Sequence, residues 1–140
     1  MTRLLVIIAV AFLVVSVAIG WMLRAYLPDA PLTYPFFYMT PVLKLLALLI
    51  VVMTGVGAFG GLKRDVKRVR TAVIINVALG ALGTGYGELN THFGVLYDSE
   101  VTFATMAPGR LHSLAIMALG LFGALVALGV LQLRGGVRRV

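Results

Sequence analysis

The chain has 140 residues, of which 61% are hydrophobic and 12% are charged, and its formal net charge is +7. Soluble globular domains carry about 25% charged residues, so this composition excludes one and favours a chain that lies in a lipid bilayer. The lack of cysteine excludes disulfides, thiolate metal sites and cysteine nucleophiles. We expect a single transmembrane domain over residues 1–140, because four spans of about 20 residues leave little chain outside the membrane.

Four apolar stretches follow one another along the chain, and each is long enough for a membrane-spanning helix. The first is longer than the apolar core of a secretory signal peptide and no cleavage-site pattern follows it, so we expect it to be retained. The expected spans cover about residues 4–24, 40–62, 71–91 and 108–133.

Proline marks two expected helix starts and one loop. Pro41 and Pro108 stand at the start of the second and fourth stretches, where the missing N–H has no helical partner. The loop between the first two stretches contains Pro28, Pro31 and Pro35, and we expect it to be extended. Aromatic side chains gather around this loop, as they do at membrane–water interfaces. They are Trp21, Tyr26, Tyr34, Phe36, Phe37 and Tyr38.

The basic residues indicate the orientation of the spans. Nine of the twelve lie at Arg3, in residues 63–70 and in residues 134–139, and Asp65 is the only acid among them. With four spans, all three segments fall on one side, and basic residues are retained in the cytoplasm. We therefore expect an all-α integral membrane protein, a four-transmembrane-helix bundle with both termini cytoplasmic, multi-pass in the bacterial cytoplasmic (inner) membrane. The charge is then explained by topology and lipid contact rather than by nucleic acid.

The third stretch carries two kinds of residue on its helical faces. Gly80, Gly83 and Gly87 share one face, and small residues allow close helix packing in membranes. Thr84, Glu88 and then Thr91 or His92 recur at steps of three or four, so hydroxyl, carboxyl and imidazole groups line one side. Such a stripe could pass a proton or hold a cation. The alternative is that Glu88 is a partly hydrated acid near the lipid headgroups.

The fourth stretch begins with a histidine near the same expected depth. His112 lies about one turn inside this stretch, and it could pair with Glu88 across the helix interface as a proton-sensitive unit. The alternative is that His112 is simply a hydrogen-bonded interfacial residue. Gly120 and Gly123 form a second close-packing patch.

Two motifs resemble the MotA/TolQ/ExbB proton-channel family. Residues 80–93, GALGTGYGELNTHF, are similar to the family motif GLxGTVxGxxxxF, and residues 107–121, APGRLHSLAIMALGL, are similar to APGIxEALxxTAxGL. The order and direction of the two motifs also agree. The resemblance implies a ring of subunits around single-span partners, whose membrane aspartate works with hydroxyls of the ring.

Residue by residue, the resemblance assigns the motif hydroxyl to Thr84, the first motif's glycines to Gly80, Gly83 and Gly87, and the start of the second motif to Ala107, Pro108 and Gly109. Two positions depart from it. His112 stands in place of the family's glutamate, and Met117 in place of its threonine. The family's large cytoplasmic region is reduced to residues 63–70.

Three hypotheses follow. The first is an oligomeric proton-channel or motor subunit that uses Thr84, Glu88, His112 and His92 together with a partner membrane protein. The second is a non-catalytic accessory or scaffold subunit of a larger membrane complex, with glycine faces as contact surfaces. Neither requires a cofactor or metal. In the third, His92 and His112 ligate a haem or copper ion. An enzyme is not expected, because the chain has no nucleophile–base–acid set, phosphate loop or carboxylate pair.

Overall fold

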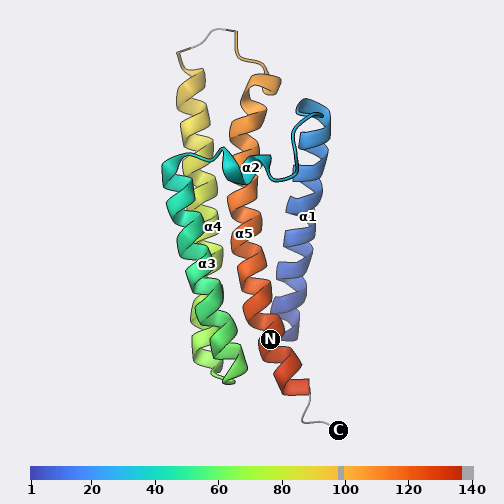
Figure 1. The fold of residues 1–140 in the computed structure, drawn as a ribbon, viewed down its shortest axis with the longest axis vertical. Helices are drawn as coiled ribbons and strands as arrows, with labels where there is room; N and C mark the ends of the chain where they lie inside the picture. Colours follow the sequence, from blue (N-terminus) through green and yellow to red (C-terminus); the bar gives the residue numbers. More distant parts are fainter. Residues whose placement is uncertain (98–99, 137–140) are drawn as a thin grey trace.

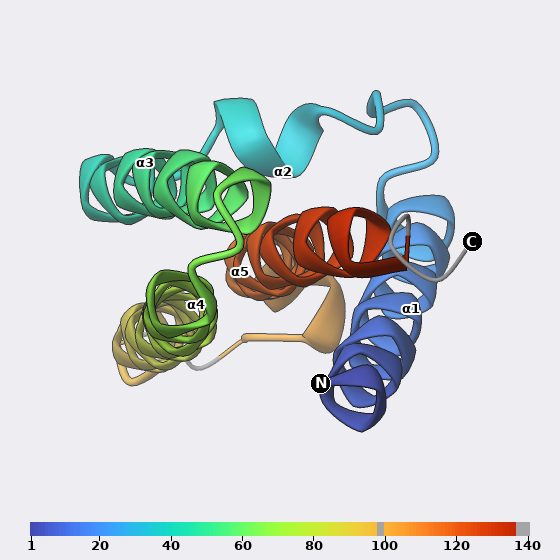
Figure 2. The same cartoon turned by 90° about the horizontal axis from the view of Figure 1, so that it is seen from below.

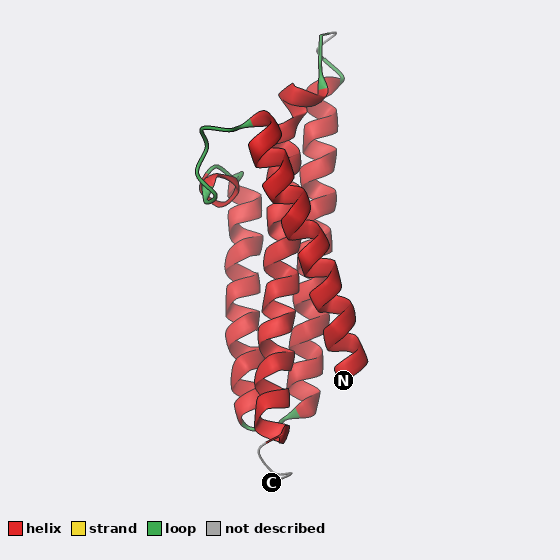
Figure 3. Cartoon of the chain, turned by 90° about the vertical axis from the view of Figure 1, so that its right-hand side faces the viewer, coloured by secondary structure: helices red, strands yellow, loops and turns green. Residues whose placement is uncertain are grey.

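The computed structural model describes residues 1–97 and 100–136, and within them the chain is helical with no strand. Four long helices run antiparallel to their chain neighbours (Figures 1 and 3), and a short helix joins the first two. They are α1 (Thr2–Tyr26), α2 (Tyr34–Phe37), α3 (Pro41–Leu62), α4 (Val66–Val95) and α5 (Phe103–Gly136). The prediction of four long apolar helices is confirmed, since α1, α3, α4 and α5 are each long and apolar enough to cross a membrane.

The helices begin where the sequence supplies capping groups. Pro41 opens α3 after Thr40, whose side chain accepts a hydrogen bond from the N–H of Leu43. Asp65 caps α4 by accepting from the N–H of Arg68 at 3.0 Å. Because only residues 63–65 separate α3 from α4, the two helices form a tight antiparallel hairpin.

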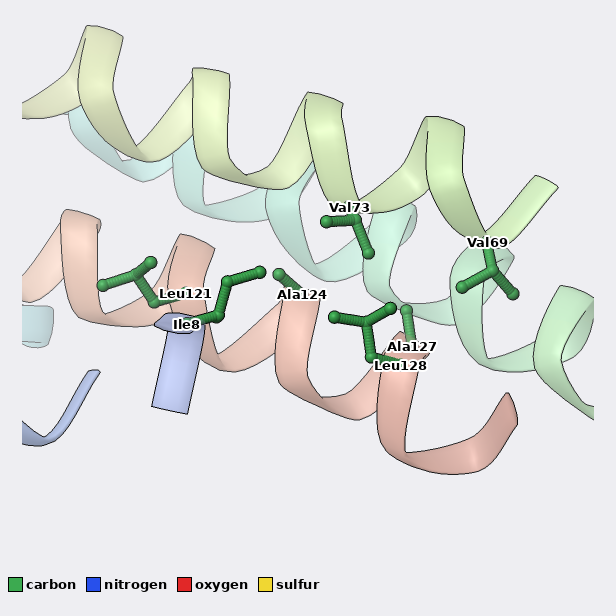
Figure 4. Close-up of a cluster of buried hydrophobic side chains, with 7 residues drawn as sticks. All are labelled: Ile8, Val69, Val73, Leu121, Ala124, Ala127 and Leu128. Atoms are coloured by element: carbon green, nitrogen blue, oxygen red, sulfur yellow. The ribbon is translucent and has the colours of Figure 1, made fainter. Parts of the chain in front are cut away.

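α5 is the central helix of the bundle. It contacts each of the other helices, and Figure 2 shows it between α1 and the α3–α4 pair. Half of the most apolar stretch of α5 is buried, against 6% of the corresponding stretch of α1. Small and branched side chains fill the junction of α1, α4 and α5 (Figure 4): Ile8, Val69, Val73, Leu121, Ala124, Ala127 and Leu128.

Two expectations about proline were wrong. The loop around Pro35 is not wholly extended, because α2 forms there with Pro35 in its first turn and buried against the bundle. Pro108 does not start the fourth long helix, since α5 begins five residues earlier at Phe103. A proline this close to the N-terminus frees only the carbonyl of Ala104, an exposed residue in the first turn.

The helices also extend past the apolar stretches. α4 runs over Val66–Val95 instead of 71–91, so its 30 residues are about 45 Å long, whereas the 22 residues of α3 are about 33 Å long. α3 ends and α4 begins at the same turn. The other end of α4 therefore extends about 12 Å beyond the first residue of α3. The outer turns of α4 and α5 project as a hairpin above α2 in Figure 1.

Candidate functional site

The predicted glycines of α4 and α5 face each other inside the chain. A Cβ added at Gly83 would lie 2.8 Å from two side-chain carbons of Ile116, and one added at Gly120 would lie 2.5 Å from the carbonyl oxygen of Asn76. Gly80 lies directly opposite Gly120. The close approach therefore requires glycine at residues 83 and 120, whereas a Cβ at Gly80 would make ordinary contacts of 3.4 Å or more. Small residues of this kind allow membrane helices to pack without a hydrophobic driving force. We call this contact the α4–α5 seam.

The seam continues outward with hydroxyl side chains. A Cβ at Gly87 would collide with the hydroxyl of the buried Ser113, and one at Gly109 would collide with the hydroxyl of Thr91. Ser113 donates to the carbonyl oxygen of Gly109 at 3.1 Å, and Thr91 donates to that of Gly87 at 2.8 Å. Both hydroxyls are therefore held on their own helices by backbone carbonyls.

Thr84, the predicted proton-path hydroxyl, joins the two helices. Its Oγ1 donates to the carbonyl oxygen of Gly80 at 2.8 Å and lies 3.1 Å from the carbonyl oxygen of Ser113 on α5. A hydroxyl has one proton, which is shared between these two acceptors. The geometry makes Thr84 a hydrogen-bonded link across the α4–α5 seam.

Glu88 and His112 lie at the same level but have different partners. The contact of Gly87 with Ser113 sets the antiparallel register, so Glu88 is level with His112. The carboxylate nevertheless lies 3.9 Å from Nε of Arg110, with both side chains partly exposed. The His112 ring instead stacks on Tyr34 of α2, with ring centroids 6.0 Å apart, and its Nε2 is buried without a hydrogen-bond partner. Arg110 of α5 thus lies against the carboxylate of Glu88 on α4. The sequence reasoning did not single out this arginine.

The two histidines also have different surroundings. His92 is exposed on α4, one turn beyond Glu88, while His112 lies beneath α2. Among residues 1–97 and 100–136, no group of three or more histidine, cysteine, aspartate or glutamate side chains could hold a metal ion. The two imidazoles that a haem or copper site would need therefore lie in different surroundings.

A buried amide that the sequence reasoning missed joins three helices. Asn76 on α4 is fully buried, and its Nδ2 donates to Oγ1 of Thr54 on α3 at 3.3 Å. Thr54 donates its own proton to the carbonyl oxygen of Ile50 at 2.7 Å, so only the amide nitrogen can face it. Gly123 of α5 closes the third side, because a Cβ there would collide with the Thr54 hydroxyl.

Asn76 lies well inside the bundle. It is ten residues from the start of α4, or about 15 Å along the helix axis, and its Oδ1 has no hydrogen-bond partner. The sequence could have indicated Asn76, because an amide in the middle of an apolar stretch is unfavourable in lipid and tends to form hydrogen bonds between helices. Asn76 precedes Gly80 by four residues, so helical spacing places it on the same face as Gly80, Gly83 and Gly87.

Comparison of the chain with known protein families, with curated proteins and with solved structures finds no match.

Proposed function

We propose that the protein is a non-catalytic subunit of a multi-subunit assembly in the bacterial cytoplasmic membrane, with both termini cytoplasmic. The start of α1, the α3–α4 turn and the end of α5 lie at one end of the bundle (Figure 1). The described basic residues of the three basic segments are therefore at that end, whereas Arg138 and Arg139 lie outside the described residues. Basic residues at one end of a short-looped bundle support the cytoplasmic orientation.

A second face of α4 carries this proposal. Ala78, Ala81 and Gly85 are exposed on the outside of the bundle, and nothing lies within 4 Å of a Cβ added at Gly85. Ala81 and Gly85 are four residues apart, which is the small-xxx-small spacing that brings membrane helices together. We call these three residues the open face of α4. In lipid, such a face favours a helix from another subunit.

The polar groups support a structural role rather than an ion path. Thr54, Thr84, Thr91 and Ser113 each donate to a backbone carbonyl of the bundle, and Asn76 donates to Thr54. These bonds leave the hydroxyls engaged within the chain. The proposed partners are other integral membrane subunits, whether copies of this chain or different proteins.

The native mass of the complex tests the proposal. Extracted from its own membrane in a mild detergent, the wild-type protein should run as a complex larger than the 15.0 kDa chain. The Gly85→Leu variant should release the folded 15.0 kDa chain, because the larger side chain blocks the open face without touching α5. Gly55→Leu is the matched control, since Gly55 is equally open but lies on α3. A wild-type monomer, or equal loss with Gly55→Leu, would contradict the proposal.

A proton-channel ring subunit of the MotA/TolQ/ExbB type is the second candidate. The observation that favours it is the position of Thr84 on the seam, about one turn inward of the partly exposed Glu88. In this hypothesis the partner protein supplies the membrane acid. Reconstituted with its native partner, the wild type should then conduct protons, and Thr84→Val, Glu88→Gln or His112→Ala should reduce the flux. Unchanged flux in all three variants would exclude these residue roles.

A further inference from the structure

A groove lies at the end of the bundle that carries the basic residues. Its volume is about 390 Å³, and its walls are the last turns of α3 and α5 with the turn between α3 and α4. The lining is apolar apart from two arginine residues: Leu62, Arg64, Val130, Leu133 and Arg134. Leu62 and Leu133 are 51% and 75% exposed, so the apolar wall opens to the surroundings.

Arg64 is held in an unusual backbone conformation beside this groove. Its φ is 59°, the left-handed region, and it is the only described residue other than glycine with a positive φ. The N–H of Asp65 donates to the carbonyl oxygen of Gly60 and that of Arg64 to Gly61, which is the helix ending that normally has glycine at this position. A non-glycine residue in this conformation is unfavourable by about 1–2 kcal/mol. Interactions of the Arg64 side chain must therefore offset this cost.

The Arg64 side chain reaches across the groove. Its Nη2 donates to the carbonyl oxygen of Arg134 in the last turns of α5. Four of the five guanidinium N–H groups remain for another acceptor. The sole acid of the basic segments, Asp65, is 3.5 Å from Arg68 and is thus directed to a different cation. Two arginines therefore line an otherwise apolar groove, and the guanidinium of Arg64 reaches across it.

We propose that this groove binds one anionic phospholipid, with its phosphate at Arg64 and Arg134 and an acyl chain along Leu62, Val130 and Leu133. A guanidinium fork matches phosphate geometry, and the apolar wall matches a hydrocarbon chain. The inference rests on the proposed function in one respect, namely that the four helices span a bilayer. It adds a specific lipid that joins the α3–α4 turn to the end of α5.

Native mass spectrometry of the purified full chain in a neutral detergent tests this site. Phosphatidylglycerol and phosphatidylcholine with identical acyl chains are titrated separately, and inorganic phosphate serves as the headgroup alone. Phosphatidylglycerol should bind at least about tenfold more tightly, because both headgroups carry the phosphate but only phosphatidylcholine brings a choline cation, which the two arginines repel. Millimolar inorganic phosphate should not displace it, because phosphate lacks the chain. Equal binding of the two lipids, or displacement by phosphate, would overturn the proposal.

Variants separate the groove from general charge attraction. Arg64→Gly removes a guanidinium while supplying the residue that favours a φ of 59°, so the turn is kept. Combined with Arg134→Gln, it should reduce phosphatidylglycerol binding to the phosphatidylcholine level. Arg70→Gln is the charge control, as Arg70 is exposed on α4 and does not line the groove. It should change binding by less than about twofold at 0.15 M salt, where distant charges are screened. An equal loss with Arg70→Gln would contradict the site.

The lipid site and the proposed function fail in distinguishable ways. A chain recovered from the soluble fraction without detergent would contradict membrane insertion and with it both proposals. A chain that stays with the membrane and assembles, but binds the two lipids equally, would contradict the groove alone.

Discussion

The α4–α5 and α1–α5 contacts are formed by different types of residue. Along the α4–α5 seam, glycines bring the backbones together and hydroxyls bond across or along them. α1 instead meets α5 through larger apolar side chains such as Ile8, and only 6% of its most apolar stretch is buried. If the bundle lies in a bilayer, lipid tails replace the apolar contacts of α1 at little cost, but they do not replace the close contacts and hydrogen bonds of the seam. We therefore expect the seam to contribute more to stability than the contacts of α1, and α1 to be the weakly held helix.

The largest effect is expected from filling the seam. Gly83→Leu forces a side chain into Ile116, so we expect a loss of about 3 kcal/mol or more in unfolding free energy, at or above the upper end for overpacking. Thermal unfolding in detergent, followed by circular dichroism, should show a lower melting temperature than for the wild type. Compared as isolated chains, in a detergent that dissociates the complex, Gly85→Leu, two residues away and open, should stay near the wild-type value. Equal melting temperatures for the two variants would mean that the seam is not tightly packed.

Asn76→Asp should have the next largest effect. The carboxylate would be fully buried without a cationic partner, which destabilises a membrane helix bundle by about 3 kcal/mol. Asn76→Leu is the control of similar size, and it should change stability by less than about 1 kcal/mol because it also removes the unpaired Oδ1. Denaturant titration in detergent measures both. A larger loss of stability in Asn76→Leu than in Asn76→Asp would show that the hydrogen bond to Thr54 matters more than the cost of burying a charge.

Thr84→Val should have a moderate effect. The change keeps the shape of the side chain and removes the bond to Gly80 and the contact with the Ser113 carbonyl. Bonds between membrane helices contribute about 1 kcal/mol, so unfolding free energy should fall by about that amount. Thr71→Val, at an exposed position on the same helix, is the control and should be silent. Equal unfolding free energies for the two variants would show that the Thr84 hydroxyl does not stabilise the α4–α5 seam.

Ile8→Ala should have the smallest effect. In water such a truncation destabilises by about 2–5 kcal/mol, but in a bilayer the hydrophobic transfer part of that loss is absent and α1 is otherwise little buried, so we expect about 1 kcal/mol or less. Leu128→Ala in the same cluster is enclosed by protein and should be the more severe change. The comparison uses one assay, unfolding in lipid nanodiscs. A greater loss at Ile8 would contradict the view of α1 as weakly held.

The sequence predicts the spans better than their ends. Apolarity marks the part of each helix that is suited to a membrane span, so the four long helices and their order could be found from length and composition. It says nothing of turns that continue into water, and α4 therefore exceeds its predicted bounds at both ends. α2 could not be predicted, because four residues make a helix only where Pro35 is buried against the bundle.

The candidate site was predictable in residue type but not in partner. Spacing alone places Gly80, Gly83 and Gly87 on one face, yet it cannot tell whether α5 or another subunit packs there. The same limit applies to Glu88, since its level with His112 was predictable but its pairing with Arg110 depends on how the side chains turn across the interface. Asn76 was visible as a polar residue in an apolar stretch, whereas its partner Thr54 came from the packing of α3.

We propose that α4 uses one face for the fold and the other for assembly. Because the chain has no cysteine, single thiols can be introduced at chosen glycines. A benzophenone maleimide attached to the Gly85→Cys variant in native membranes should capture a neighbouring protein chain on illumination, identified by the mass of the adduct. The same probe on the Gly55→Cys variant, equally open on α3, should capture none. Capture at residue 55 but not at residue 85, or at neither, would contradict the account.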